Sequence, residues 1–184
     1  MRKTPVIVFI NKMDRDGKNR FDLLEEIENE LKIQLHPMTV PINSGKDFKG
    51  VYDLHKKSLV LFTAGTKAND EDVLEIKDIN DEILNTKIGE RDAATLREDV
   101  ELIDGVYGEL GTSAYLSGHT GPVFFGSAIN NFGVKELLET FVRIAPLPQC
   151  RPTSARIVCP DEEKLSGFVF KIHANLDPKH RDRI

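Results

Sequence analysis

A short apolar run that ends directly in a polar turn constrains the fold of this chain most. Residues 6–10 are Val-Ile-Val-Phe-Ile, apolar at every position. A strand that is apolar on both faces is typical of a central strand in a parallel sheet covered by helices. Asn11, Lys12, Met13 and Asp14 follow the run without a break. Because ligands of open α/β sheets bind beyond the carboxyl ends of the strands, these residues are candidates for a binding site.

The pattern Asn-Lys-x-Asp after a strand is the one by which GTP-binding proteins recognise guanine. The Asp14 carboxylate has two acceptor oxygens and guanine presents two adjacent donors, N1–H and the N2 amino group, so the match is bidentate and charge-assisted. Adenine has neither donor and would leave a desolvated acceptor unpaired, at a cost of ~1–3 kcal/mol or more. The Lys12 stem can cover the base while its ammonium stays hydrated, and Asn11 can fix the loop to neighbouring backbone.

A second polar turn follows a second buried run. Residues 121–126, Gly-Pro-Val-Phe-Phe-Gly, precede Ser127 and Ala128. The small side chain of Ala128 lets the backbone approach a base, so that its N–H can donate to guanine O6, and Ser127 can hydrogen-bond the Asp14 carboxylate. Alone, Ser-Ala after a strand is better explained as a helix cap ahead of residue 133. Together with the first turn, it predicts the second half of one guanine site at the same sheet edge.

Other parts of a nucleotide site are missing from the sequence. There is no GxxxxGK[ST] phosphate loop, since Gly45-Lys46 lacks the upstream glycine and the Ser/Thr. Residues 14–17 fit the DxxG pattern of a magnesium-side switch loop, but Asp14 is already committed to the base. The histidines and cysteines have no metal-ligand spacing, so we predict no metal site. A piece of a longer protein explains this combination better than a degenerate enzyme.

Composition limits the class of protein. The 184 residues suffice for one domain or one and a part, and the net charge of −5 argues against a nucleic-acid coat. The first apolar run is too short for a signal peptide, and no stretch approaches the ~20 apolar residues of a membrane span. Cys150 and Cys159 lack a paired spacing, and we predict free thiols in a reducing cytoplasm.

The hydrophobic pattern predicts an α/β sheet followed by a segment of different character. Residues 19–34 have helical periodicity, and 38–42 are a short apolar run with two prolines, which gives a strand–helix–strand order. Residues 50–54 and 59–62 are two strand-like runs that we expect to form a hairpin. Residues 133–145 predict an amphipathic helix. Its expected inward residues are Val134, Leu137, Leu138, Phe141 and Val142.

Residues 64–105 are strongly acidic, with thirteen Asp or Glu against five Lys or Arg, a net of −8. Leu96, Val100 and Ile103 fall on one helical face, and Arg97 and Glu101 are spaced for an i,i+4 ion pair. A solvated helix face is one interpretation of such a segment. A surface for a basic partner is the other, and the sequence leaves both open.

The last forty residues predict a linker followed by strands. Residues 147–154 are proline-rich, and 155–159 and 166–174 have strand character. Phe168, Phe170 and Ile172 fall at alternate positions, as in a barrel or a half-buried sheet. A local basic cluster then follows, for which an ordinary solvated turn is one interpretation. It consists of Lys179, His180, Arg181 and Arg183.

Longer stretches of the chain resemble the bacterial release factor 3 family of translational GTPases. They are NKMDRDG, SGKDFKGVYDLHK, PVFFGSAINNFGV and above all GFVFKIHANLDPKHRDR. The resemblance covers nearly the full length and is loosest in the acidic segment. Elongation factor G shares the architecture but not this combination of segments, so an elongation-factor-like translocation GTPase is the first alternative. A non-catalytic ribosome- or protein-binding module with a vestigial base pocket is the second.

The resemblance implies an α/β fold made of the C-terminal half of a P-loop-type G domain, with a parallel sheet and flanking helices. Residues 1–43 and 120–145 would form this half, and 44–119 an α+β insert subdomain within it. Residues 146–154 would be a linker. Residues 155–184 would be the first strands of a truncated β-barrel domain.

The family's activity implies a GTPase that uses GTP to release class I release factors from the ribosome. By position, Asn11, Lys12 and Asp14 match its base-recognition motif, and Ser127 and Ala128 match the second motif. The implied cofactor is GTP or GDP; the Mg²⁺ ligands and catalytic residues would lie outside this chain. Implied partners are the ribosome and class I release factors, with a ribosomal protein at the acidic insert. The family context also implies that the basic cluster at residues 179–183 faces ribosomal RNA or a domain interface. No membrane partner is expected.

These 184 residues alone are expected to hydrolyse no GTP. They are expected to bind GDP weakly or not at all. The reason is that phosphate binding at a glycine-rich loop and a helix N-terminus supplies much of the affinity for a nucleotide.

Overall fold

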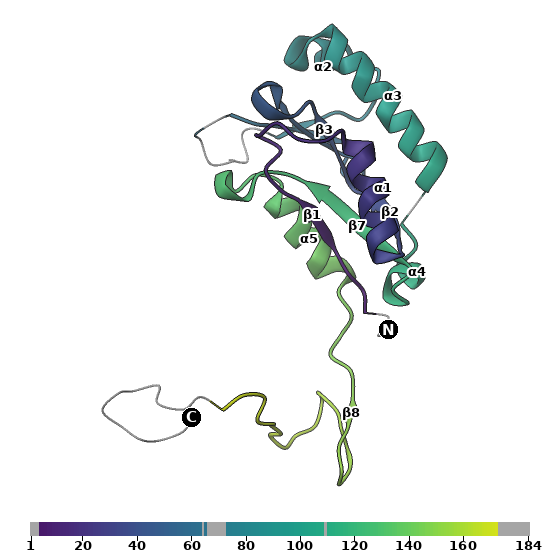
Figure 1. Cartoon of the computed structure of the whole chain (residues 1–184), viewed down its shortest axis with the longest axis vertical. Helices are drawn as coiled ribbons and strands as arrows, with labels where there is room; N and C mark the ends of the chain where they lie inside the picture. Colours follow the sequence, from purple (N-terminus) through teal and green to yellow (C-terminus); the bar gives the residue numbers. More distant parts are fainter. Residues whose placement is uncertain (1–3, 64, 66–72, 109, 173–184) are drawn as a thin grey trace, which may run out of the picture. The chain divides into compact units, whose positions relative to one another are not determined.

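The computed structural model divides into two compact units, Met1–Ala145 and Pro146–Ile184 (Figure 1). The part of the chain that it describes consists of residues 4–63, 65, 73–108 and 110–172. The first unit contains two sheets, one parallel and one antiparallel, together with the longer helices. The α/β fold predicted from the sequence is therefore correct.

A three-stranded parallel sheet forms the base of the first unit. Its order is β1 (Val8–Ile10), β7 (Thr120–Phe125) and β2 (Gln34–Pro37). Strand β7 is the buried central strand and matches the prediction over 121–126. The prediction for residues 6–10 was wrong in one respect, because β1 is an edge strand of this sheet and its residues are only half-buried. The apolar sequence of β1 would suit a strand with neighbours on both sides, but among the described residues only β7 pairs with it.

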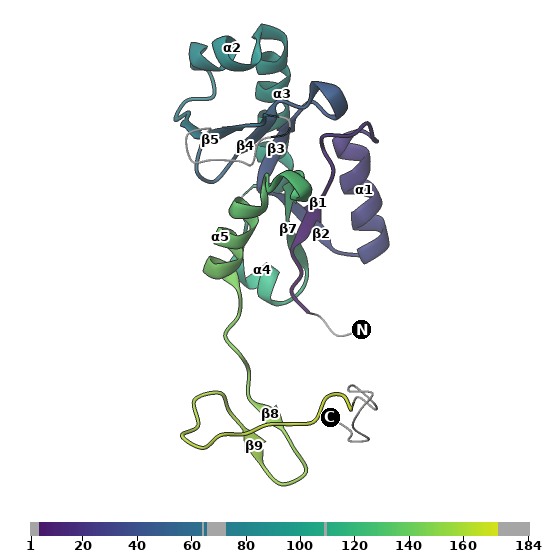
Figure 2. The same cartoon turned by 90° about the vertical axis from the view of Figure 1, so that its left-hand side faces the viewer.

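Helix α1 (Arg20–Leu31) joins β1 to β2, so a strand–helix–strand order is present, but the helix is shorter than the predicted 19–34 and the second strand lies before the predicted 38–42. It begins at Asn19, whose side chain accepts a hydrogen bond from the N–H of Phe21 at 2.9 Å, an N-cap of the kind that satisfies a free first-turn donor. It ends at Lys32 in the left-handed conformation. Figure 2 shows α1 and α5 (Val134–Ile144) on opposite sides of the parallel sheet.

The second sheet is antiparallel, in the order β3 (Thr39–Ile42), β4 (Gly50–Asp53), β5 (Ser58–Leu61) and β6 (Val73–Glu75). Strands β4 and β5 form the predicted hairpin. The predicted strand over 38–42 corresponds to β3, but β3 pairs with β4 of the insert, and β2, which was not predicted, takes the place in the parallel sheet. Pro41 is tolerated because β3 is an edge strand of its sheet.

Two helices pack on the antiparallel sheet, α2 (Glu82–Ile88) and α3 (Glu90–Tyr107). Leu96, Val100 and Ile103 are buried in this core, as their helical spacing predicted. The described helices, α3 included, are too short or too polar to span a membrane.

The predicted ion pair between Arg97 and Glu101 was wrong. The Arg97 guanidinium donates to the carbonyl oxygen of Ile79 at 2.9 Å and to Asn85 Oδ1 at 3.1 Å. Arg97 is partly buried against the α2 region. These acceptors are partly buried, whereas Glu101 is exposed, and an exposed ion pair contributes little because water screens it.

Among the described residues, three short helical turns connect the larger elements. The 3₁₀ turn η1 (Gly45–Asp47) opens the insert after β3. Helix α4 (Thr112–Leu116) precedes β7, and the 3₁₀ turn η3 (Ala128–Asn130) follows it. The turn η1 contains Gly45 and Lys46, which the sequence analysis compared with a phosphate loop, and η3 contains Ala128 of the second predicted motif.

Helix α5 forms where it was predicted, but its orientation differs from the prediction. Leu138, Phe141 and Val142 are 53%, 49% and 80% exposed, whereas Glu136 and Thr140 are buried. Helical periodicity finds an apolar face but does not show which part of a molecule covers it. Val134 and Leu137 are half-buried beside these two residues. The exposed Glu139 pairs with Lys56 of the β4–β5 turn.

The second unit contains a minimal antiparallel hairpin of β8 (Arg151–Pro152) and β9 (Ile157–Val158). Cys150 and Cys159 flank it and form a disulfide, so the prediction of free thiols was wrong. The register, with Arg151 opposite Val158, places the two cysteines opposite each other, with Cα atoms 4.1 Å apart. Sequence spacing alone did not reveal this cross-strand contact.

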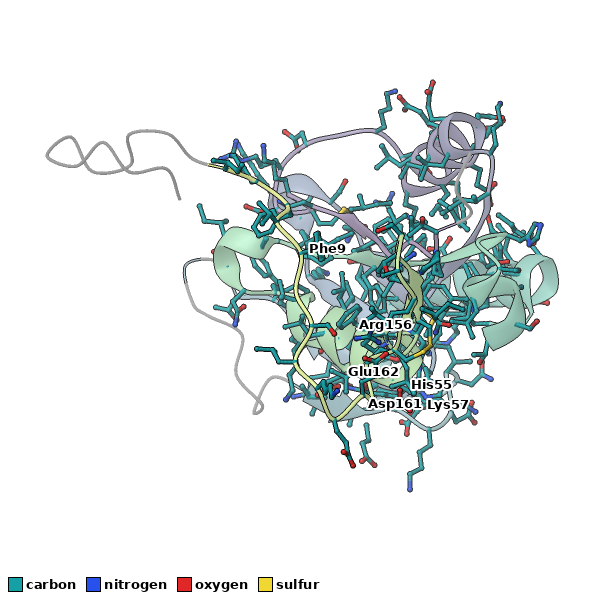
Figure 3. All side chains as sticks on the ribbon, turned by 90° about the horizontal axis from the view of Figure 1, so that it is seen from below. Phe9, His55, Lys57, Arg156, Asp161 and Glu162 are labelled. Atoms are coloured by element: carbon teal, nitrogen blue, oxygen red, sulfur yellow. A yellow bond between two sulfur atoms is a disulfide. The ribbon has the colours of Figure 1, made fainter. Side chains whose placement is uncertain are left out.

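The strands predicted in the second unit are shorter than expected. Of 155–159 only Ile157–Val158 is strand, β8 lies inside the predicted linker, and 166–172 form no strand. Phe168, Phe170 and Ile172 are exposed. The guanidinium of Arg156 donates to both oxygens of Glu162 at 2.6 Å, and Figure 3 shows these two side chains pointing toward one another. The end of the predicted strand, 173–174, and the basic cluster at 179–183 lie outside the described residues.

Burial raises the pKa of Glu136 above its ordinary value of 4.5, against the opposing charge of Lys56. The folded state therefore holds this proton more tightly than the unfolded state, so the contribution of Glu136 to stability is largest below the ordinary pKa and is lost as pH rises through the raised one. We expect Glu136→Gln to increase the free energy of unfolding at pH 7 by ~1–2 kcal/mol, and by less at pH 4.

Urea unfolding at the two pH values measures this difference. Glu30→Gln on exposed α1 surface is the matched control and should change little at either pH. A Glu136→Gln variant that is less stable at pH 7 than at pH 4, relative to the unsubstituted chain, would contradict the account.

Candidate guanine-binding site

The two polar turns predicted from the sequence lie side by side. The first motif loop (residues 11–14) follows β1, and the second motif loop (residues 127–129) follows β7. Strands β1 and β7 are parallel neighbours with Ile10 opposite Phe125, so both loops leave the sheet at the same edge. This is the carboxyl edge at which open α/β sheets bind ligands.

Asn11 joins the two motif loops directly. Its Oδ1 accepts a hydrogen bond from the N–H of Ala128 at 2.9 Å and another from the N–H of Lys12 at 2.8 Å. The first of these bonds connects residues 117 positions apart in the chain. The sequence analysis assigned Asn11 the role of fixing the loop to neighbouring backbone, and the structure places it in contact with the second motif.

Asp14 has an unsatisfied oxygen at this junction. Its Oδ1 is buried, and no donor among the described residues hydrogen-bonds it. A buried carboxylate oxygen without a partner costs more than the ~1–3 kcal/mol of an unpaired neutral group. Native proteins rarely keep such an atom, and a bound ligand that supplies the donor is one explanation. Asp14 is also the residue to which the sequence assigns the donors of guanine.

Ser127 and Ala128 have partners other than those predicted. Ser127 is fully buried, and its Oγ accepts from Asn130 Nδ2 at 2.8 Å, while Asp14 Oδ1 receives no bond from it. The Ala128 N–H, expected to be available for a base carbonyl, points at Asn11. In this structure the hydrogen bonds of Ser127 and Ala128 therefore stabilise the motif loops themselves.

Lys12 has a backbone conformation that suits the tight first turn. Its φ is +66°, in the left-handed region that most residues avoid. Its carbonyl oxygen accepts from the N–H of Arg15 at 3.0 Å, which closes the turn. The Lys12 side chain is exposed, as a side chain that lies over a base plane must be before the base arrives.

Met13 anchors the first motif loop and was overlooked by the sequence analysis. The residue is only 6% exposed. Its N–H donates to the carbonyl of Gly126 at 3.0 Å, and its own carbonyl accepts from the N–H of Gly45 at 2.9 Å. The one signal in the sequence was an apolar residue at the variable position of the motif. Because Met13 points into the core, its neighbours Lys12 and Asp14 are left toward the edge of the sheet.

Gly126 allows β7 and the second motif loop to approach each other closely. A Cβ at this position would overlap the carbonyl oxygen of Phe132 and would lie 2.8 Å from the Phe9 ring. Ser127 and Phe132 exchange two backbone hydrogen bonds of 3.0 Å, which close the second motif loop. The loop is thus fixed at its base by backbone contacts.

Two further features of the described residues bear on alternative sites. A cavity in the second unit is lined by residues that include Arg151, Glu162 and Phe168, and its lining contains none of the predicted site residues. Within the described ranges, no group of three or more His, Cys, Asp or Glu side chains could hold a metal ion.

Comparison with known proteins identifies the class to which this geometry belongs. The model of the family described as the elongation factor Tu GTP binding domain matches residues 1–147. The chain therefore belongs to this family of translational GTPases, whose common ligand is a guanine nucleotide. A crystal structure of a protein from Thermus thermophilus is similar, with 21% sequence identity over 77% of this chain and a TM-score of 0.47. The chain covers 22% of that protein's length.

The bond between Asn11 and Ala128 gives a direct prediction for the site. We expect Asn11→Ala to remove the acceptor for the Ala128 N–H and to speed exchange of that amide with solvent by ~5- to 10-fold, as the loss of about 1 kcal/mol implies. Amide hydrogen exchange followed by NMR on the 184-residue chain measures this rate.

Two variants control for a general loosening of the site. Asn11→Asp keeps an acceptor oxygen and should preserve the slow exchange. Asn130→Ala removes the bond to Ser127 Oγ but leaves Asn11 in place, and it should affect Ala128 less. Unchanged exchange of the Ala128 amide in Asn11→Ala would show that Asn11 does not join the loops.

Proposed function

We propose that this chain supplies the guanine-recognition half of the nucleotide site in a translation-termination GTPase. In this proposal the full-length protein uses GTP to release class I release factors from the ribosome in the cytoplasm. The observation that carries the proposal is the buried Oδ1 of Asp14, which has no partner among the described residues and lies beside two motif loops joined through Asn11 and Ala128. Membership of the translational GTPase family supports the guanine nucleotide as the ligand.

The chemistry of Asp14 favours guanine over other bases. Its carboxylate would accept from N1–H and the N2 amino group together, a bidentate and charge-assisted pairing. A site built to accept from donors rejects a base without them, because the acceptors are left unpaired. Lys12, exposed in the turn, would cover the base plane, and the Ala128 N–H would be shared between Asn11 and guanine O6.

The phosphates and Mg²⁺ would be held by parts of the protein outside these residues. Gly45, the one candidate for a degenerate phosphate loop, is buried and donates its N–H to Met13. We therefore propose that these residues alone bind GDP weakly and hydrolyse no GTP, since phosphate contacts supply much of the affinity for a nucleotide.

The termination role is supported by the segments that resemble the release factor 3 family, above all residues 167–183. An elongation-factor-like translocation GTPase would use the same base site with a different ribosomal state. The non-catalytic module would keep the site without turnover. The three hypotheses predict different combinations of release-factor dissociation and ribosome-stimulated GTP turnover. An assay with ribosomes therefore separates them.

The exposed face of α3 is the candidate contact for a ribosomal protein. Glu98 and Glu101 are exposed there, and Leu102 and Val106 beside them are 51% and 59% exposed. A surface stripe that is both acidic and apolar is better explained by contact with a basic amphipathic partner than by exposure to solvent alone. We propose this face of the insert as the site of such a contact.

We expect the full-length protein to accelerate dissociation of a class I release factor from ribosomes stalled after peptide release, and only with GTP. A fluorescent label on the release factor allows the rate to be followed directly. No acceleration, with ribosome-stimulated GTP turnover still present, would favour the translocation GTPase. Absence of both activities would favour the non-catalytic module and reject the proposal.

A further inference from the structure

The start of the insert is bonded to the first motif loop. The N–H of Gly45, the first residue of η1, donates to the carbonyl of Met13 at 2.9 Å. Met13 immediately precedes Asp14, so this bond fixes the peptide from which the guanine-binding carboxylate projects. The donor comes from outside the parallel sheet, because Gly45 belongs to the connection between β3 and β4.

The contact between the two segments is too close for a side chain. Gly45 has a φ of +66°, which L-residues with a Cβ adopt only with strain. A Cβ at Gly45 would overlap Asp16 Oδ1 and lie 3.3 Å from the backbone nitrogen of Asp16. The backbone of the insert therefore rests directly on the turn that follows Asp14.

The insert also packs against Phe132, which is bonded to the second motif loop. Phe48 packs edge-to-face against Phe132, with ring centroids 5.6 Å apart. Phe62 of the insert packs on Phe132 as well, at 5.2 Å. Phe132 exchanges two backbone hydrogen bonds with Ser127, the first residue of the second motif loop. Aromatic pairs of this geometry add a modest stabilisation beyond the burial of their surface.

The segment is attached in turn to the helices of the insert. Lys49 Nζ donates to the carbonyl of Ile88 at 2.5 Å and pairs with Asp92 of α3 at 2.6 Å. A further ion pair joins Arg20, the first residue of α1, to Asp99 of α3. Figure 2 shows α2, α3 and the antiparallel sheet together above the parallel sheet. A shift of the insert would thus be transmitted to both motif loops.

We propose that residues 45–48 are a positioning element for guanine recognition, through which the insert sets how selectively Asp14 binds the base. Gly45 holds the first motif loop through its bond to Met13, and Phe48 supports the second through its contact with Phe132. This inference rests on the proposed function, because it assigns the control of the same guanine site. Gly45 and Phe48 are positioning residues, since neither contacts the base in the proposal.

The test compares GDP with inosine diphosphate, whose base lacks the N2 amino group. The ratio of the two affinities in the full-length protein measures the pairing of Asp14 with that group. We expect Gly45→Ala to lower the ratio by ~10-fold, the loss expected when a charged hydrogen bond is misaligned. Phe48→Leu, which keeps an apolar side chain of similar size, should lower it by a smaller factor.

Gly108→Ala is the matched control. Gly108 also has a positive φ, of +59°, but lies at the end of α3 with open space around it. The Gly108→Ala variant should lose thermal stability and keep the ratio of its affinities for GDP and inosine diphosphate. Asp16→Ala combined with Gly45→Ala removes the overlapping side chain and should restore part of the ratio.

The outcomes separate this inference from the proposed function. A full-length protein that binds GDP and inosine diphosphate equally well before any substitution would reject guanine recognition by Asp14. Normal selectivity that persists in both Gly45→Ala and Phe48→Leu would reject the positioning role alone. An equal loss of affinity for both nucleotides would mean that residues 45–48 act on stability only, and it would also reject the role.

Discussion

The backbone of Met13 is the contact on which the candidate site depends. Its N–H is bonded to Gly126 at the end of β7, and its carbonyl to Gly45 at the start of the insert. Added Cβ atoms at both glycines would overlap neighbouring atoms, so the three segments approach each other by bare backbone. The parallel sheet, the second motif loop and the insert are thereby joined at one residue.

Burial of Met13 explains how polar residues on either side of it come to face a ligand. An apolar side chain in the core contributes ~1.5–3 kcal/mol of stability, and this holds a turn in which Lys12 has an unfavourable φ of +66° and Asp14 keeps an unpaired buried oxygen. The strain and the unsatisfied carboxylate are thus maintained by packing elsewhere in the fold. Such costs gather at functional sites.

The sequence predicted those features that depend on local pattern. Strand β7, helix α3 and the two motif loops follow from apolar periodicity and from polar residues placed after buried strands. The exposed apolar face of α5, the pairing of β3 with the insert and the disulfide at Cys150 did not follow, because each depends on a partner that local pattern does not reveal. For the same reason, Asn11 was assigned a general role, while its bond to Ala128 could be found only in three dimensions.

The most direct test of the central claim is the nucleotide preference of Asp14→Asn in the full-length protein. The substitution turns one acceptor of the carboxylate into a donor, which suits xanthine, with a carbonyl where guanine has its amino group. Affinities for GDP and xanthosine diphosphate should shift relative to each other by ~2–4 kcal/mol in favour of xanthine. An unchanged preference for GDP would show that Asp14 does not bind the base.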